Sequence, residues 1–272
     1  MNITDIPMLF GYQFFQHALL GGMMAAAACA AMGIFLLLRR EALIGEGIAH
    51  VSFGGIALGI FIGVYPIYTA LLLSIIATLS ITYMRRKGFA QSDAAIGIVV
   101  AFGLSLGLVL LSLSGGFNVD LFTYLFGSIL TIDLQDLATS AVLAVVVLSF
   151  LVILHKELLS MTFDEKSARV SGIPVDKIEF AFNILVAVTV ALSIKIIGIL
   201  LVTALLIMPG IAALQLKLSF RGTLAAAVTI SIVCVVAGVI ISAMVNIATS
   251  AVIIFASMAA AGITTAYQKL GS

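Results

Sequence analysis

The chain has 272 residues, of which 63% are hydrophobic and only 9% are charged, and its formal net charge is +1. Soluble globular domains carry about 25% charged residues, so the composition excludes a soluble fold and predicts one all-α integral membrane domain over residues 1–272. The small net charge, and the lack of a basic stripe with interleaved aromatic residues, argue against nucleic-acid binding.

Apolar runs long enough to cross a membrane recur along the whole chain, separated by short polar stretches. A transmembrane helix needs roughly 20 apolar residues to cross a hydrocarbon core about 30 Å thick. The pattern predicts nine crossings, or eight if the first or the last run is not a true span. These crossings lie at about 14–38, 43–64, 67–84, 94–113, 134–154, 178–194, 197–216, 222–243 and 248–267.

Basic residues predict how these crossings are oriented, because Lys and Arg in short loops stay on the cytoplasmic side of a membrane. With nine crossings, every Lys and Arg except Lys195 falls on one side. This distribution places the N-terminus outside and the C-terminus in the cytoplasm. We therefore expect a multi-pass protein of the plasma or inner membrane.

One apolar run, residues 119–132, is too short to cross comfortably, and acidic residues flank it. If it did cross, the following basic loop would move outside. We therefore expect a short external or re-entrant helix, since backbone of this kind is tolerated at membrane depth only within protein or beside a cavity. The expected neighbourhood is an external gate with Asp120, Phe126 and Gly127, although a short loop helix packed on the bundle fits equally well.

Glycines repeat at four-residue spacing in two crossings. Gly55, Gly59 and Gly63 lie in the second crossing, and Gly103 and Gly107 lie in the fourth. Small residues on one face of a helix let helix backbones approach closely in lipid. The spacing predicts close helix packing and says nothing about a substrate.

The informative ionisable residues within the crossings are Glu46 and His50, in the stretch GEGIAH. An ionised group at the bilayer centre costs about 2.5–3.5 kcal/mol, so such groups are usually functional or paired. Their spacing of four places both on one helix face. A carboxylate oxygen and an imidazole nitrogen suit zinc, and with less preference manganese or iron. We predict a transient metal site completed by water or a second subunit; the alternative is a hydrogen-bonded pair near the cytoplasmic interface.

The longest polar segment is FDEKSARVSGIPVDK, at 163–177. Asp164 and Glu165 precede a short helix-compatible run that contains Arg169, and Gly172 and Pro174 end it. The pattern predicts a short cytoplasmic helix suited to docking another protein, although a plain connecting loop is equally compatible. The chain has no GxxxxGK[ST] motif, so an ATP-driven function needs another chain to bind ATP.

With these features the sequence resembles, over essentially its whole length, the zinc, manganese and iron permease family of ATP-binding-cassette importers. The similar blocks are ALIGEGIAHVSFGGIALG, SDAAIGIV, VDLFTYLFGSIL, ELLSMTFDEKSARVSGIPV and GILLVTALLIMPGIAA. Two departures stand out: Glu46 replaces the Asp usual in the family, and residues 246–250 lack the usual Pro and Gly. Residues 105–127 resemble the zinc-type members of the family more than the manganese-type members.

The resemblance implies a bundle like that of type II ABC importers, in the permease subunit of an ATP-driven importer. This subunit would move a divalent metal ion, with zinc favoured, from an external metal-binding protein to the cytoplasm. It implies a homodimer of permeases and two cytoplasmic ATPase subunits, with no catalytic residue or bound cofactor in this chain. Glu46 and His50 would line the ion route, and the segment with Asp164, Glu165, Arg169, Gly172 and Pro174 would meet the ATPase.

Three alternatives remain open from the sequence. The first is a manganese or iron permease of the same family. The second is a stand-alone ion-coupled carrier, for which inverted repeats and more buried ionisable residues would be expected. The third is a multi-pass membrane enzyme, for which only Glu46 and His50 come close to a reactive constellation.

Overall fold

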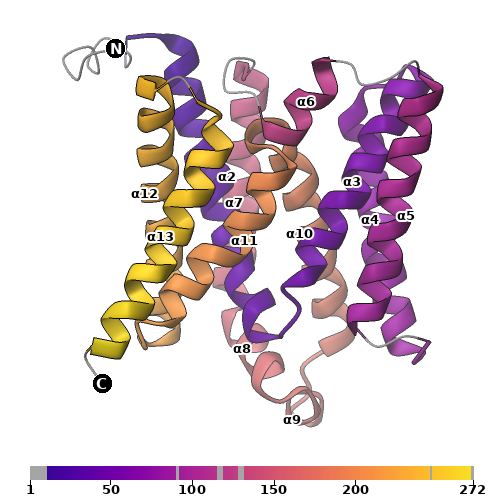
Figure 1. Cartoon of the computed structure of the whole chain (residues 1–272). Helices are drawn as coiled ribbons and strands as arrows, with labels where there is room; N and C mark the ends of the chain where they lie inside the picture. The colour runs from indigo at the N-terminus through magenta and orange to yellow at the C-terminus, as the bar shows by residue number, and fades with distance from the viewer. Residues whose placement is uncertain (1–10, 90–91, 115–118, 128–131, 246, 271–272) are drawn as a thin grey trace.

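The computed structural model describes residues 11–89, 92–114, 119–127, 132–245 and 247–270. Every regular element in these residues is an α-helix, as predicted. In chain order the helices are α2 (Gln13–Leu38), α3 (Leu43–Ile62), α4 (Pro66–Arg86), α5 (Ser92–Leu113), α6 (Val119–Phe126), α7 (Leu134–Ile153), α8 (His155–Phe163), α9 (Glu165–Val170), α10 (Val175–Ile197), α11 (Ile199–Leu214), α12 (Phe220–Val245) and α13 (Thr249–Leu270) (Figure 1).

Each of the nine predicted crossings is a helix, and eight of them have the length and apolar composition needed to span a membrane. The exception is α11, which has 16 residues. At 1.5 Å per residue it spans about 24 Å, less than the roughly 30 Å of a hydrocarbon core. The count of eight to nine crossings is confirmed; by length and composition, α2 and α13 qualify as spans, and α11 is the short helix.

The long helices run in alternate directions between two ends of the bundle (Figure 1). The lower end in this view carries α8, α9 and the turns that follow α2 and α4. The helix α6 lies at the upper end, between the upper ends of α5 and α7. Its eight residues do not cross the bundle, so the prediction of a short, non-crossing helix is confirmed. Residues 128–131 lie outside the described part of the chain.

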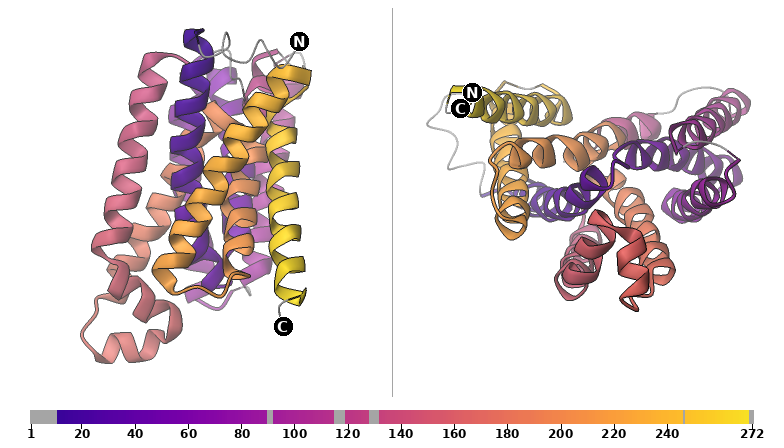
Figure 2. Two further views of the ribbon diagram at one scale, coloured as in Figure 1. Left: turned by 90° about the vertical axis from the view of Figure 1, so that its left-hand side faces the viewer. Right: turned by 90° about the horizontal axis from the view of Figure 1, so that it is seen from below.

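The core is built around α2, which packs against α7, α10, α11 and α12. Its middle, from Ala25 to Met32, is buried and consists mainly of alanine, whose small side chain lets neighbouring helices approach closely. A second group is formed by α3 with α4 and α5, and α10 joins the two groups by touching α2, α3 and α4 (Figure 2). The cysteines Cys29 and Cys234 are buried and free, as expected of packing residues.

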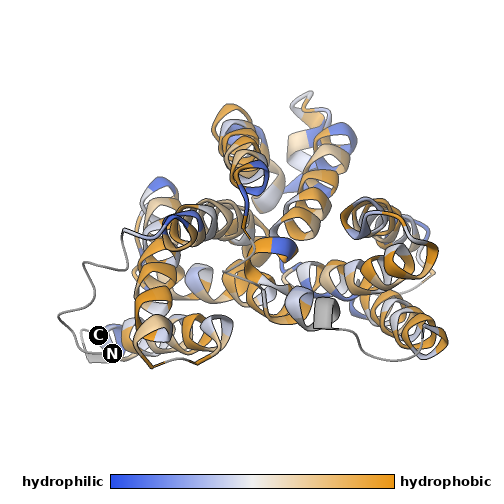
Figure 3. Ribbon diagram, turned by 90° about the horizontal axis from the view of Figure 1, so that it is seen from above, coloured by the Kyte–Doolittle hydropathy of each residue, from blue (hydrophilic) through white to orange (hydrophobic). Residues whose placement is uncertain are grey.

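The outside of the bundle is apolar, as contact with lipid requires. Hydrophobic residues dominate the helices all round the molecule in the view along the bundle (Figure 3). Large side chains such as Phe102, Val145 and Phe255 are each more than 60% exposed to the surroundings. In water such a surface would be an extended apolar patch, so its position on the long helices matches a membrane-embedded protein.

Candidate functional site

Glu46 and His50 lie in the first two turns of α3, at the end of the bundle that carries α8 and α9. Glu46 is in the first turn, where the positive end of the helix dipole favours a carboxylate. The Oε1 atom of Glu46 lies 3.8 Å from Nε2 of His50, so the helix brings the two side chains together as their spacing predicted. Their side chains are 48% and 25% exposed.

The separation of these two side chains is longer than a hydrogen bond, which joins nitrogen and oxygen at about 2.7–3.2 Å. At this separation the carboxylate oxygen and the imidazole nitrogen are close enough to coordinate the same metal ion. In the described residues no group of three or more His, Cys, Asp or Glu side chains could hold a metal ion. A closed structural zinc site needs about four protein ligands, so the pair can form only part of a coordination shell.

The helix α3 is held by unusually close backbone contacts with α4 and α5. A Cβ atom added at Gly103 would lie 2.6 Å from Cα of Val51, and one at Gly55 would lie 2.6 Å from Cα of Ala70. Gly59 and Gly107 are similarly confined, so the predicted close packing is confirmed at these four glycines. Gly63 has another role: it ends α3 with a φ of +74°, and a Cβ added to it would meet no atom of the described residues within 4 Å apart from its chain neighbours.

The polar segment between the crossings folds into α8 and α9. The Asp164 side chain accepts hydrogen bonds from the backbone N–H groups of Lys166 and Ser167 and thereby caps the start of α9. Gly172, with a φ of +82°, follows its end: Gly172 N–H donates to Arg169 C=O, and Ile173 N–H donates to Ala168 C=O. This pair of bonds is a Schellman motif, which favours glycine. The predicted start and stop of the short helix are confirmed.

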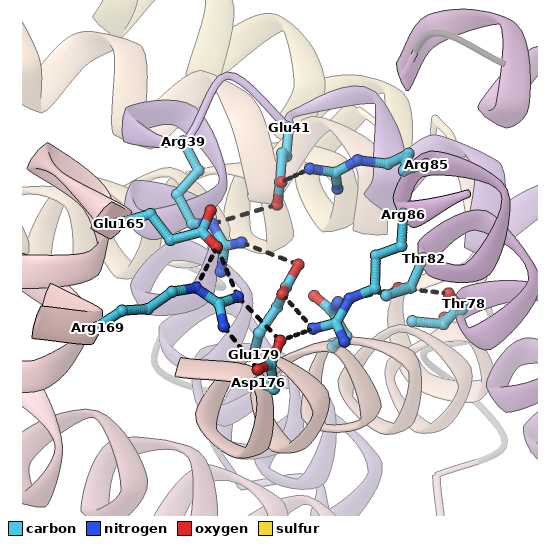
Figure 4. Close-up of polar contacts among 11 residues, drawn as sticks. Arg39, Glu41, Thr78, Thr82, Arg85, Arg86, Glu165, Arg169, Asp176 and Glu179 are labelled. Carbon is cyan, nitrogen blue, oxygen red and sulfur yellow. Dashed lines mark hydrogen bonds and ion pairs between the residues drawn. The ribbon is translucent and has the colours of Figure 1, made fainter. Parts of the chain in front are cut away.

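A chain of ion pairs connects this segment to the membrane helices (Figure 4). Arg169 of α9 pairs with Asp176 of α10, and Arg86 of α4 pairs with both Asp176 and Glu179 of α10. We call the set the cytoplasmic charge chain, with reference to the side expected from the basic loops. Its members are Glu165, Arg169, Asp176, Arg86, Glu179, Arg39, Glu41 and Arg85.

The sequence alone did not predict the cytoplasmic charge chain. Arg39, Arg85 and Arg86 were used only to orient the crossings, and no role was given to Glu41 or Glu179. Both acidic residues are buried, with exposed fractions of 5% and 8% for the whole residue. Buried acidic residues are rare unless they are paired, so a carboxylate at the second position of the predicted crossing 178–194 was the signal that could have identified Glu179.

The opposite end of the bundle holds a smaller polar cluster. Lys195, the basic residue left alone by the orientation argument, forms an ion pair with Asp136 of α7. Asp133 caps α7: its carboxylate accepts from the backbone N–H of Asp136, and this hydrogen bond lowers the pKa of Asp133. The isolated cation is therefore neutralised within the bundle, as the cost of a lone charge in the membrane requires.

The predicted gate residues lie at this end, beside a cavity of about 500 Å³. Phe126 and Gly127, at the end of α6, line it together with residues of α2, α11 and α12. Gly127 also packs against the turn at Gly198, where an added Cβ would overlap backbone atoms on either glycine. Asp120 is in α6, but its side chain lies outside the described part of the structure.

Comparison with known proteins identifies the family. Residues 11–268 match the ABC 3 transport family. The chain is 33% identical to the high-affinity zinc uptake system membrane protein ZnuB of Haemophilus influenzae over 90% of this chain and 94% of that protein. It is 30% identical to the manganese transport system membrane protein MntC of Halalkalibacterium halodurans, over 90% and 84% of the two chains.

A solved structure has the same fold over the whole chain. The structure is PsaBC from Streptococcus pneumoniae in complex with Fab, with a TM-score of 0.87, 27% identity and coverage of 100% of both chains. The resemblance read from the sequence is thereby confirmed, as is the expectation that ATP hydrolysis resides in a separate subunit. The match favours a transport subunit over a stand-alone carrier or a membrane enzyme. The chain belongs to the ABC 3 transport family.

Proposed function

We propose that this chain is the permease subunit of an ATP-driven importer that carries a divalent metal ion, with zinc favoured, into the cytoplasm. The observation that carries the proposal is the juxtaposition of Glu46 and His50 on α3 of a chain from this family. The names of the zinc-uptake and manganese-transport relatives support a divalent cation as the substrate.

The pair supplies one oxygen and one nitrogen ligand from one helix face, and neither side chain is fully buried. A transported ion must leave again, so two protein ligands with water, or the same pair from a second copy, suit its passage better than a closed site. An oxygen–nitrogen set accepts zinc readily and manganese or iron with less preference. We therefore place the ion, as substrate, between the α3 helices of a permease homodimer.

The remaining parts of the proposal concern partners and gates. The segment 163–175, with Asp164, Glu165, Arg169, Gly172 and Pro174, docks on a cytoplasmic ATPase subunit. An external metal-binding protein delivers the ion to the end of the bundle that carries α6, where Asp120, Phe126 and Gly127 form the gate. The capped, exposed α9 supports the docking role, because a rigid short helix offers a defined surface.

The function is tested by metal uptake into vesicles that contain the permease with its ATPase. Zinc, manganese and iron are each offered to the wild type and to Glu46→Gln and His50→Asn, singly and combined. These changes keep hydrogen-bonding groups but weaken coordination, so uptake should fall while the complex still assembles and hydrolyses ATP. Glu46→Asp should retain uptake, because it keeps the carboxylate, and His155→Asn serves as a histidine control on α8.

Wild-type uptake by the double variant would remove Glu46 and His50 from the ion route. Absence of metal-stimulated ATPase activity in the wild type for all three metals would overturn the proposed function itself. A wild-type preference for manganese over zinc would support the second candidate metal, since the 30% identical manganese relative covers 90% of this chain.

The proposed orientation has its own test. A cysteine at Ser167, in α9, should react with an impermeant reagent only from the cytoplasmic side, and one at Thr4 only from outside. The native Cys29 and Cys234 are buried and should contribute little background. Reaction of both introduced cysteines from outside intact cells would contradict the nine-crossing topology.

A further inference from the structure

We propose that the cytoplasmic charge chain transmits the position of α9 to the start of α3, with Glu41 as the residue that positions Glu46 and His50. This inference rests on the proposed function, because it adds a coupling element to the same metal site. Its starting point is that α9 and α3 are far apart in the sequence but are joined by one unbroken series of contacts (Figure 4).

The series alternates in charge from end to end. It begins with Glu165–Arg169 at 2.9 Å, Arg169–Asp176 at 2.7 Å and Asp176–Arg86 at 2.8 Å. It continues with Arg86–Glu179 at 2.8 Å, Glu179–Arg39 at 3.4 Å, Arg39–Glu41 at 3.4 Å and Glu41–Arg85 at 2.5 Å. The four acidic side chains and the four arginines together carry no net charge. The elements it joins are α9, α10, α4, α2 and the turn before α3.

The environment of the chain changes from water to protein along its length. The side chain of Arg169 is 45% exposed, that of Glu179 is 11% exposed and that of Glu41 is 5% exposed. Exposed ion pairs exchange partners at little cost. A buried charge that loses its partner is strongly unfavourable, so the inner pairs must move together or exchange partners together. A displacement of α9 is therefore transmitted along the series to Glu41. The ion pairs of Glu41, nearest in sequence to the proposed metal site, are the most tightly constrained because this side chain is the most buried.

Glu41 is tied rigidly to both helices that flank it. The turn between α2 and α3 is a Schellman motif, in which Arg40 N–H donates to Leu37 C=O and Glu41 N–H donates to Leu36 C=O. Arg40 takes the left-handed position, with a φ of +56°, where glycine is usual. The backbone of Glu41 accepts a hydrogen bond from Ile44 N–H in the first turn of α3. Movement of Glu41 is therefore movement of the first turn of α3.

The inner part of the chain also has unused hydrogen-bonding capacity. Among the described residues, the buried Nη1 atoms of Arg39 and Arg85 have no hydrogen-bond partner, and the buried Oε2 of Glu41 has only its 3.4 Å ion pair with Nε of Arg39. A group of side chains that served only to hold the fold together would be expected to satisfy its buried polar atoms. The spare donors of Arg39 and Arg85, the two arginines that pair with Glu41, allow a second pairing of the same residues, which a coupling element with two arrangements requires.

The test uses the full importer, permease with its ATPase, in proteoliposomes. A cysteine at Leu43, the first and partly exposed residue of α3, reports the position of the helix through its rate of maleimide modification with and without ATP. The second readout is the number of zinc ions imported per ATP hydrolysed. Both are measured in Arg169→Gln, Glu41→Gln and the double variant. Lys87→Gln serves as the control, because it removes an exposed basic charge next to Arg86 that does not belong to the cytoplasmic charge chain.

We expect ATP to change the modification rate at Leu43→Cys in the otherwise wild-type protein and in the Lys87→Gln control. Each single variant should reduce this response and lower the ions-per-ATP ratio by about fivefold or more, the lower end of typical coupling between sites. Because both residues act through one series of contacts, the double variant should be no worse than the more damaging single variant. If Glu41→Gln does not fold, Arg86→Gln interrupts the same series at an exposed position.

Three results would overturn the inference: an unchanged Leu43→Cys response in the single variants, effects that multiply in the double variant, or no ATP response in the wild type. Failure of the proposed function gives a different result, since an importer that moves no metal can still show the ATP response at Leu43→Cys. The two ideas therefore fail separately.

Discussion

The tight contact between α3 and α5 leads to a quantitative prediction at Gly103. An alanine there would place Cβ 2.6 Å from Cα of Val51, whereas ordinary contacts lie at 3.4–4 Å. Because the neighbour is backbone, the two helices must separate by about 1 Å, and overpacking of this kind costs about 1–3 kcal/mol. The higher helix propensity of alanine returns about 0.5–1 kcal/mol. The net loss should lie between about 0 and 2.5 kcal/mol, with a central value of about 1 kcal/mol.

Gly97 provides a matched control in the same helix, because in the part of the chain that the structure describes an added Cβ there would meet nothing within 4 Å except its own helix backbone. Gly97→Ala should leave the stability unchanged or raise it slightly. Unfolding of both variants and the wild type is measured in one detergent, by the midpoint of the thermal transition. A Gly103→Ala protein as stable as Gly97→Ala would refute the inferred helix contact. Metal uptake by Gly103→Ala should also fall, because the displaced α3 carries Glu46 and His50.

Two further substitutions test the ends of the bundle. Gly198→Ala places a side chain on a backbone with φ +82° and ψ 159°, a conformation essentially restricted to glycine, and that side chain would overlap the backbone at Gly127. We expect the free energy of unfolding to fall by more than about 1–3 kcal/mol in the same assay. A wild-type midpoint would contradict the contact between α6 and Gly198. Asp164→Ala removes the N-cap of α9 and should lower the stability of that helix by about 0.5–2 kcal/mol. Backbone hydrogen exchange should therefore accelerate over residues 165–170 but not in α8. Equal exchange in the variant and the wild type would show that the cap is dispensable.

Local patterns were sufficient for much of the secondary structure. The nine apolar runs correspond to helices because the length needed to cross the hydrocarbon core is a property of consecutive residues. The start of α9 at Asp164 and its end at Gly172 were predictable for the same reason, since capping and left-handed turns depend on a few adjacent residues. The proximity of Glu46 and His50 follows from helix geometry alone.

Glycine spacing indicated tight packing but not every role. Gly54 faces the backbone of Gly103 and was not singled out, while Gly63 matched the spacing yet ends the helix. A repeat of four residues identifies a helix face, but the position of the neighbouring helix decides which glycines on and beside that face are confined. The sequence contains the first kind of information and not the second.

The charge chain depended on tertiary structure throughout. Its inner pairs join Arg39 to Glu179, 140 positions apart, and Glu41 to Arg85, so no window of sequence contains both partners. The Lys195–Asp136 pair is likewise made across two helices. By itself the sequence determined which segments form long apolar helices and which side chains share a helix face, because these properties are local. Only the packing of α2, α3, α4 and α10 decided which buried charges meet, because the low-polarity interior requires each charge to find a partner from whichever helix lies beside it.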